Sequence, residues 1–337
     1  MKKANKLGLI LCIFAMVMIL LDSNCAITGA RDGIKLCLYT VLPSLFPYCV
    51  LSILFRSLIT EYSFQWIRPL ERLCFFPEGT GILFLLGLLG GYPIGAICVE
   101  KAVEQKQLSC NSARYLRAIY NAAGPSFIIG ILGTIIKNRK LLFILIMIQA
   151  LSAMLTNLIL SQKQSETHST KPQIALSLSQ AISQAYPCML NVCGLIIISR
   201  VIISYIVKYL SKYISTQLWT IIAGTMELTN GILLLNNFQN EHVIFIIAAG
   251  MLSFGGLCVF MQTITISAPN TGKYYFIGKL IQTSISILLA AMFIIVQRII
   301  YLILIYIIIF SCIRFVKSKF SLNLGPNKFK KEVEIQV

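Results

Sequence analysis

An acidic residue inside an apolar segment is the strongest chemical feature of the sequence. Residues 226–231 read MELTNG, so Glu227 is followed closely by Thr229, Asn230 and Gly231. A carboxylate at membrane depth is costly, and such residues commonly mark an ion or proton pathway. The glycine interrupts a helix and frees backbone carbonyls, while the three polar side chains add oxygen atoms. We therefore expect a coupling-ion or proton site here; the alternative is a structural carboxylate at a helix end or paired with an arginine.

Arg56 and Arg200 occupy equivalent positions in two proline-containing apolar segments, 37–59 and 176–207. Two guanidinium groups related in this way could hold an anionic substrate through bidentate hydrogen bonds. Either could instead pair with Glu227, or extend to the membrane surface because each lies near the end of a span. We favour extension to the surface and keep both arginines as secondary candidates for substrate binding.

A second candidate site lies in YNAAGPSFIIG, where Asn121, Gly124 and Pro125 interrupt the apolar segment 119–136. The helix that follows is expected to begin at Ser126. Its first N–H groups and its positive partial charge would then be directed at an anion. We therefore predict that Asn121, Gly124 and Ser126 contribute to a substrate site.

The sequence SFGGLCVFMQ repeats this arrangement further along the chain. Gly255 and Gly256 interrupt the segment 242–266, and Gln262 offers an amide one to two turns later. The same argument makes Gln262 a candidate for substrate binding. The alternative for all these glycines is close helix packing through small residues, which is common in membranes. Their recurrence at matched places favours a functional role.

The motif GGYPIGA, residues 90–96, is the third interruption. Gly91, Pro93 and Gly95 together are incompatible with a regular helix interior. Non-helical backbone at membrane depth is tolerated only where it is buried in protein or lines a watery cavity. We therefore expect these residues, like the other breaks, to lie inside the protein.

The amino-acid composition indicates whether these residues lie in a soluble or a membrane protein. The chain has 337 residues, of which 57% are hydrophobic and 12% are charged. A soluble domain carries about 25% charged residues, so this chain is expected to be an integral membrane protein. Its 29 Lys and Arg outnumber its 12 Asp and Glu, and they fall in short gaps between apolar runs and in the C-terminal tail. That distribution marks cytoplasmic loops rather than a nucleic-acid surface.

Cofactor and enzyme chemistry find no support in the sequence. The 11 cysteines form no CxxC pair, and the only two histidines, His168 and His242, stand apart. Zinc, haem and iron–sulfur spacings are therefore absent, and we predict no metal and no cofactor. The sequence contains no catalytic or nucleotide-binding motif of the HExxH, GxSxG or Walker A kind. We expect a protein that is not an enzyme.

The apolar pattern predicts an all-α polytopic membrane protein with roughly eight to ten hydrophobic segments that cross or enter the membrane. The N-terminal segment begins with a basic stretch and is interpreted as a retained signal anchor. The predicted segments are 7–22, 37–59, 80–99, 119–136, 141–160, 176–207, 217–235, 242–266, 276–297 and 299–314.

The two halves of the chain resemble each other. Each contains, in order, a proline-containing segment that carries an arginine and two glycine-broken segments. If 80–99 and 217–235 are re-entrant hairpins, the halves become inverted repeats; if all segments cross, the repeats are parallel. The charge distribution places both termini in the cytoplasm either way. We favour hairpins, because segments interrupted at matching positions of two halves are typical of inverted repeats around a central site.

This organisation predicts a division of the chain along its length. The parts are an N-terminal signal-anchor helix and loop (1–34), a first repeat (35–160), a polar linker (161–175), a second repeat (176–297), a last transmembrane helix (298–316) and a basic cytoplasmic tail (317–337).

Five motifs in order give the sequence a resemblance to a known family. It resembles the sporulation integral membrane proteins of the YlbJ type, which carry the nucleoside-recognition Gate domain. The likeness extends over about residues 35–280. The motifs that carry it are LPSLFPYCVL (42–51), GGYPIGA (90–96), YNAAGPSFIIGILG (120–133), MELTNG (226–231) and SFGGLCVFMQ (253–262).

The resemblance implies transport of dipicolinate, a small planar dianion, from the mother-cell cytosol across the outer forespore membrane during sporulation. We therefore expect a secondary transporter of a small organic anion in the cell membrane or outer forespore membrane. Its partners would be the anion and the lipid bilayer, with a homo-oligomer as a further option. The alternatives are transport of nucleosides or another solute, and a non-transporting membrane scaffold in spore formation.

Overall fold

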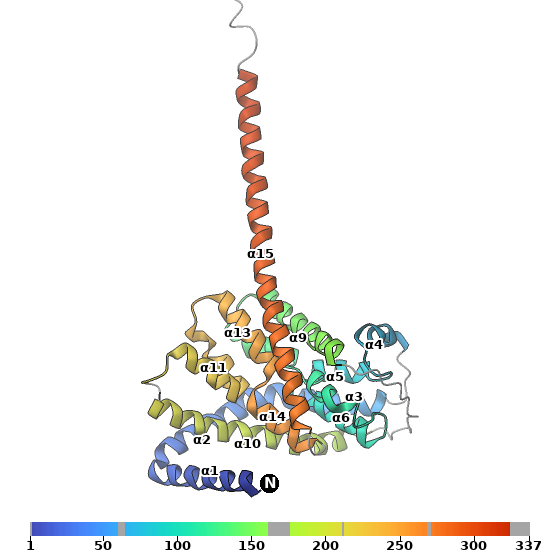
Figure 1. Ribbon diagram of the computed structural model, residues 1–337, viewed down its shortest axis with the longest axis vertical. Helices are drawn as coiled ribbons and strands as arrows, with labels where there is room; N and C mark the ends of the chain where they lie inside the picture. The colour runs from blue at the N-terminus through green and yellow to red at the C-terminus, as the bar shows by residue number, and fades with distance from the viewer. Residues whose placement is uncertain (1, 60–64, 161–175, 211, 268–270, 324–337) are drawn as a thin grey trace, which may run out of the picture. The chain divides into compact units, whose positions relative to one another are not determined.

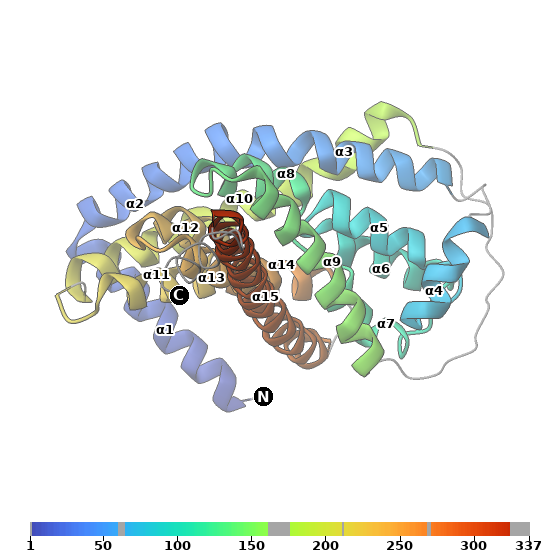
Figure 2. The same cartoon turned by 90° about the horizontal axis from the view of Figure 1, so that it is seen from above.

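The computed structural model describes residues 2–59, 65–160, 176–210, 212–267 and 271–323. The chain divides into two compact units, residues 1–290 and 291–337. The described residues form helices and connecting turns without any strand, which confirms the all-α prediction. The α-helices, labelled across Figure 1 and Figure 2, are α1 (Lys2–Leu21), α2 (Ser23–Leu36), α3 (Leu42–Ile59), α4 (Arg68–Cys74), α5 (Gly81–Gly90), α6 (Ile94–Glu104), α7 (Ala113–Ile119), α8 (Pro125–Gly130), α9 (Arg139–Leu160), α10 (Leu178–Leu210), α11 (Thr216–Met226), α12 (Leu228–Leu234), α13 (Glu241–Phe254), α14 (Gly256–Ile266) and α15 (Gly272–Asn323).

Four helices or helix pairs are long and apolar enough to cross a membrane, by length and composition. They are Arg139–Leu160, Leu178–Leu210, Glu241–Ile266 and Gly272–Gln297, and the pair Gly8–Leu21 and Ser23–Val41, bent by 102°, would make a fifth. The described part of the chain is therefore that of a helical membrane protein with several spans.

Two proline-containing helices run antiparallel along most of their length. Helix α2 continues through a π-helical turn, Cys37–Val41, into α3, and Figure 2 shows the two following one another along one edge of the first unit. A Cβ atom added to Gly33 would lie 2.8 Å from the Cα atom of Ile197 in α10. At the far end, the N–H of Leu176 donates to Ser57 Oγ at 3.1 Å. Residue numbers rise in one helix as they fall in the other, which defines the antiparallel packing.

The segments predicted at 80–99 and 217–235 are helical hairpins. A Cβ atom on Gly87 of α5 would lie 2.9 Å from the Cα atom of Gly95 in α6. One on Gly231 of α12 would lie 2.1 Å from the Cα atom of Gly224 in α11. In a continuous helix, residues seven or eight positions apart are separated by about 10–12 Å. The chain therefore turns back on itself in both segments, as the hairpin interpretation requires.

The glycine-broken segments in each half are interrupted helices. Between α7 and α8 the backbone is unwound from Tyr120 to Gly124, and α13 ends at Gly255 before α14 begins at Gly256. Each half thus contains a proline-bearing helix, a hairpin, an interrupted helix and a long helix. The first three of these are in the order that the sequence comparison of the two halves predicts, and the long helix that follows in each half was not part of that prediction.

One helix includes both of the predicted segments 276–297 and 299–314. Helix α15 is continuous from Gly272 to Asn323, so the polar pair Gln297–Arg298 does not end it. A helix satisfies its backbone hydrogen bonds internally, and two polar side chains that are good helix formers do not disturb it. Only glycine, proline or a capping side chain would have marked a real end.

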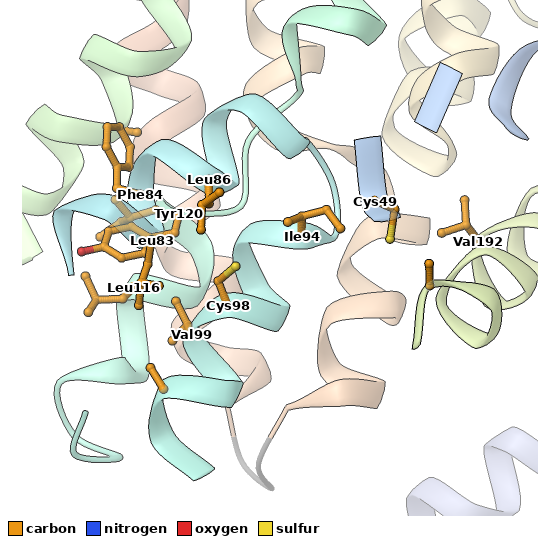
Figure 3. Close-up of a cluster of buried hydrophobic side chains, with 14 of the residues drawn as sticks. Cys49, Leu83, Phe84, Leu86, Ile94, Cys98, Val99, Leu116, Tyr120 and Val192 are labelled. Atoms are coloured by element: carbon orange, nitrogen blue, oxygen red, sulfur yellow. The ribbon is translucent and has the colours of Figure 1, made fainter. Parts of the chain in front are cut away.

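A hydrophobic core holds the first hairpin in place. Figure 3 shows Leu83 and Phe84 of α5 beside Leu116 and Tyr120 at the end of α7. The rings of Phe84 and Tyr120 have centroids 5.6 Å apart, and the Tyr120 hydroxyl lies 2.7 Å from Thr80 Oγ1. These contacts anchor Tyr120, which is the residue at which the unwound stretch begins.

Candidate functional site

All four interruptions meet around one cavity in the first unit. The two hairpin tips contribute Tyr92 and Glu227, the unwound stretch contributes Gly124, and α14 contributes Gln262. The remaining lining comes from α3, α8, α10 and their neighbours and is almost entirely apolar. It comprises Val41, Leu45, Ala123, Phe127, Ile131, Val192, Ile196, Leu228, Thr229, Cys258 and Val259.

The first hairpin tip packs directly on the unwound stretch of its own half. Gly91 has a φ of +75°, which favours glycine. A Cβ atom on Gly91 would lie 3.0 Å from the backbone nitrogen of Gly124, and one on Gly124 would lie 3.1 Å from Gly91. The sequence prediction that these glycines lie inside the protein is thereby explained: two backbones touch where neither has room for a side chain. Pro93 follows the turn in a cis peptide bond with Tyr92.

The second hairpin tip packs on the other interruption in the same manner. Gly255 and Gly256 both have positive φ values, +78° and +84°. A Cβ atom on Gly256 would lie 3.2 Å from the carbonyl oxygen of Gly224 and 3.3 Å from the backbone nitrogen of Leu228. Each hairpin tip therefore packs closely against the broken helix of its own half, and glycines at the contact leave room for the two backbones.

Tyr92 joins the first hairpin to the interruption of the other half. Its hydroxyl donates to the carbonyl oxygen of Leu252 at 2.8 Å, with that of Ser253 at 3.3 Å. These carbonyls belong to the last turn of α13, which has no helical partners for them. A Cβ atom on Gly255 would lie 2.9 Å from the Tyr92 ring, so glycine is needed there for the ring to fit.

Glu227 caps a helix and lines the cavity. Its two carboxylate oxygens accept hydrogen bonds from the backbone N–H groups of Thr229 at 2.9 Å and Asn230 at 2.8 Å. The side chain is 4% exposed. Within the described residues no ion pair joins it to Arg200. The carboxylate therefore stabilises the start of α12 and, at the same time, lines the cavity.

Thr229 and Asn230 differ in their surroundings. Thr229 lines the cavity beside Glu227. The side chain of Asn230 is 2% exposed, and neither atom of its amide has a hydrogen-bond partner in the described structure. An unpartnered buried amide is costly. The Asn230 amide therefore leaves a hydrogen-bond donor and an acceptor unsatisfied next to the hairpin tip.

The predicted anion-binding residues do not all reach the cavity. Gly124 and Gln262 line it, whereas Asn121 and Ser126 do not. The amide of Asn121 donates to Thr263 Oγ1 and to the Tyr275 hydroxyl, each at 3.1 Å. Asn121 therefore connects the unwound stretch to α14 and α15.

The helix start predicted at Ser126 is one residue late. Helix α8 begins at Pro125, with Gly124 as its N-cap, because proline suits the first helical position. The Ser126 hydroxyl is buried without a partner. Since α8 has only six residues, it offers a weaker dipole than a full-length helix would.

Arg200 does not line the cavity. Arg200 lies on α10 against α2, where its Cβ atom would be 3.3 Å from a Cβ added to Gly33, and its Nε is buried without a hydrogen-bond partner. The side chain of Arg56 lies outside the described residues. The predicted pairing of the two guanidinium groups around one anion therefore stays a prediction.

Sequence reasoning missed a buried lysine beside this site. Lys279 on α15 is 1% exposed, and its ammonium group donates to the backbone carbonyl of Asn121. It also donates to Gln282 Oε1 at 2.9 Å. Lysine near the start of an apolar segment usually extends to the membrane surface, which is why the sequence did not single it out.

A buried ion pair was also missed. Arg117 on α7 and Glu100 on α6 form a salt bridge, and the arginine is 1% exposed. Both lie at the ends of predicted apolar segments, where charges are expected to reach water. The pair lies away from the cavity lining and ties the first hairpin to the interrupted helix of the same half.

The cavity is small in this conformation. Its volume is about 40 Å³, and a water molecule needs roughly 10–15 Å³ by this measure. Ligand pockets for organic molecules measure several hundred Å³. The arrangement can therefore hold a few water molecules or a small ion as it stands, and an organic solute would require the hairpin tips to separate.

No protein-family model matches the chain, and no curated protein or solved structure does either.

Proposed function

We propose that this protein is a secondary transporter of a small organic anion, with dipicolinate as the solute. The observation that carries the proposal is the meeting of four helix interruptions, two from each half, around one cavity. Unwound backbone inside a membrane protein is tolerated where it lines a cavity. Interrupted helices at matching positions of two halves are the best indication of a transport site.

The antiparallel packing of α3 and α10 supports inverted repeats. These two helices hold equivalent places in the two halves, and the continuous stretch of α2 and α3 runs opposite to α10, from Gly33 beside Ile197 to Ser57 beside Leu176. Inverted repeats allow a transporter to open alternately to each side by moving one part against the other. The small cavity then corresponds to a closed state between the two openings.

The polar groups of the cavity suggest how an anion would be held. Gln262 offers an amide donor, and Thr229 offers a hydroxyl. The apolar walls from α3 and α10 suit the ring of a planar aromatic acid. Glu227 shares this space, with both its oxygens held by N–H groups, and it is our candidate for coupling. The absence of an ATP-binding motif leaves an ion gradient or the solute's own gradient as the driving force.

The resemblance to the YlbJ type supplies the solute and the setting. On this proposal the protein lies in the cell membrane or outer forespore membrane, and the charge distribution predicts that both termini are in the cytoplasm. The proposal therefore includes movement of dipicolinate from the mother cell toward the developing spore.

The decisive experiment measures dipicolinate separately in mother cells and forespores of a sporulating strain that lacks the gene. We expect dipicolinate to be made and to stay in the mother cell. Complementation with the wild-type gene should restore transfer, and Gln262→Leu should not. Met261→Leu is the matched control, because Met261 is exposed on the same helix and does not line the cavity. Normal dipicolinate transfer in the deletion strain would contradict the proposed solute.

Two other outcomes would identify the alternatives. Thermal stabilisation of the purified protein by nucleosides, without stabilisation by dipicolinate, would indicate a nucleoside transporter. A sporulation defect that Gln262→Leu repairs as well as the wild-type gene would indicate a scaffold, since a scaffold does not need the cavity amide.

A further inference from the structure

The ammonium group of Lys279 is enclosed by neutral partners. It donates to the backbone carbonyl of Asn121 and to Gln282 Oε1, and the Tyr92 hydroxyl lies 3.4 Å away. The rings of Tyr92 and Tyr275 also face it, with centroids 5.1 and 5.9 Å from Nζ. Among the described residues no carboxylate forms an ion pair with it. A fully buried charge without a counterion is rare. Its hydrogen-bond partners and the neighbouring rings must compensate for the hydration that the ammonium group loses.

These partners are the kind that bind a free cation. Backbone carbonyls released by an unwound helix, side-chain oxygens and the ends of half-helices coordinate coupling cations in transporters. Aromatic faces attract cations as well. The neutral groups around Lys279 are therefore those of a cation site, and the ammonium group of Lys279 occupies it.

The end of α7 explains why a backbone carbonyl is available to the ammonium group of Lys279. Helix α7 ends at Ile119 with Tyr120 as its C-cap, and Asn121 follows in the unwound stretch. The carbonyl end of a helix carries negative partial charge and leaves carbonyl groups without helical partners. The ammonium of Lys279 thus donates to a carbonyl that lies just beyond the end of α7, outside any helix.

The other half contains a neutral counterpart. Gln149 on α9 reaches the interruption between α13 and α14, where its Oε1 accepts from Ser253 Oγ at 3.1 Å. Its Nε2 donates to the carbonyl of Ala249 at 3.2 Å. The last long helix of each half therefore inserts a polar side chain into the interruption of the other half. Only one of these two side chains carries a charge.

We propose that the Lys279 ammonium is a tethered substitute for a bound cation at the interruption between α7 and α8. This interruption then takes no free sodium or potassium ion in the native protein. The site itself does not depend on which solute is moved. Its consequence for transport rests on the proposed function: any free coupling cation must bind elsewhere, such as beside Glu227.

The test removes the tethered cation and offers a free one. Lys279→Ala leaves space for propylammonium, which matches the atoms lost from the side chain. Thermal unfolding of the full-length protein in detergent is measured with about 100 mM propylammonium chloride or choline chloride. We expect propylammonium to raise the midpoint of Lys279→Ala by several degrees over choline, and to leave the wild-type protein unchanged.

Gln149→Ala is the matched control, because it empties the corresponding neutral position in the other half. Its midpoint should be the same in both salts. An equal shift in both variants, or no shift in either, would overturn the proposal. If Lys279→Ala cannot be purified in choline, the readout becomes the folded protein recovered in each salt: recovery with propylammonium alone supports the site, and equal recovery overturns it.

A transport assay separates this inference from the proposed function. If the wild-type protein moves no organic anion in proteoliposomes while Lys279→Ala is stabilised by propylammonium, the transporter proposal fails and the cation site stands. If the wild-type protein transports and propylammonium does not distinguish the two variants, the cation site fails and the transporter proposal stands.

Discussion

The hydroxyl of Tyr92 lies 2.8 Å from the carbonyl oxygen of Leu252, and this hydrogen bond joins residues 160 positions apart in the sequence. It links the tip of the first hairpin to the end of α13, so the interruption of one half is closed by a side chain of the other. Because Tyr92 also lines the cavity and faces Lys279, one residue connects the cavity with both interrupted helices.

Tyr92→Phe removes this hydrogen bond and keeps the ring. We expect a loss of about 1 kcal/mol in the free energy of unfolding, since the carbonyl of Leu252 is left buried without that partner. Denaturant unfolding in detergent measures the change. Tyr213→Phe is the control, because Tyr213 is 85% exposed, and it should leave the stability unchanged. Equal effects from the two substitutions would show that the contact does not stabilise the fold.

Gly95→Ala tests the contact between the first hairpin and the unwound stretch. A Cβ atom at Gly95 would lie 1.8 Å from the carbonyl oxygen of Tyr120, a backbone atom that cannot rotate away. We expect a loss of about 3 kcal/mol or more, or failure to accumulate in the membrane. Gly194→Ala on α10 has open space around its Cβ atom and should change stability by less than about 1 kcal/mol. A stable Gly95→Ala protein would contradict this packing.

Glu227→Ala tests the helix cap. Two backbone N–H groups lose their carboxylate partners in a buried position, so we expect a loss of about 2 kcal/mol or more. Asn240→Ala removes an exposed cap, which accepts from the N–H groups of His242 and Val243, and should cost about 1 kcal/mol. Thermal or denaturant unfolding compares the two, and a smaller effect at Glu227 would argue against a structural role.

Glu100→Gln tests the buried ion pair. The substitution leaves Arg117, 1% exposed, with an uncompensated charge, and we expect a loss of about 3 kcal/mol or more. Glu104→Gln in the exposed pair with Lys101, at 3.8 Å, should cost at most about 0.5 kcal/mol. Adding Arg117→Met to Glu100→Gln should recover part of the loss, because no unpaired charge then remains. Unfolding of the three variants decides the matter.

Local signals in the sequence predicted several element ends, but the break predicted at Gly231 was wrong. Gly231 lies inside α12, and the helix is interrupted at Glu227 instead, because the Glu227 carboxylate caps the N–H groups of Thr229 and Asn230. Gly91 and Pro93 turn the first hairpin, and Gly255 ends α13, because these residues impose their conformation wherever they occur. The same local rules placed the start of α8 within one residue. They could not place the charged residues: Glu100, Arg117 and Lys279 sit near the ends of apolar runs, where a buried charge and one that extends to water look alike.

The sequence by itself determined that this is a helical membrane protein with two similar halves whose helices are broken at matching places, because apolar composition and glycine or proline act over a few residues. Only the tertiary structure decided that the four interruptions share one cavity, that Glu227 caps α12, and that Lys279 binds the carbonyl of Asn121. Those contacts depend on how distant segments pack, and packing is set by the shape and polarity of the whole interior rather than by any short stretch.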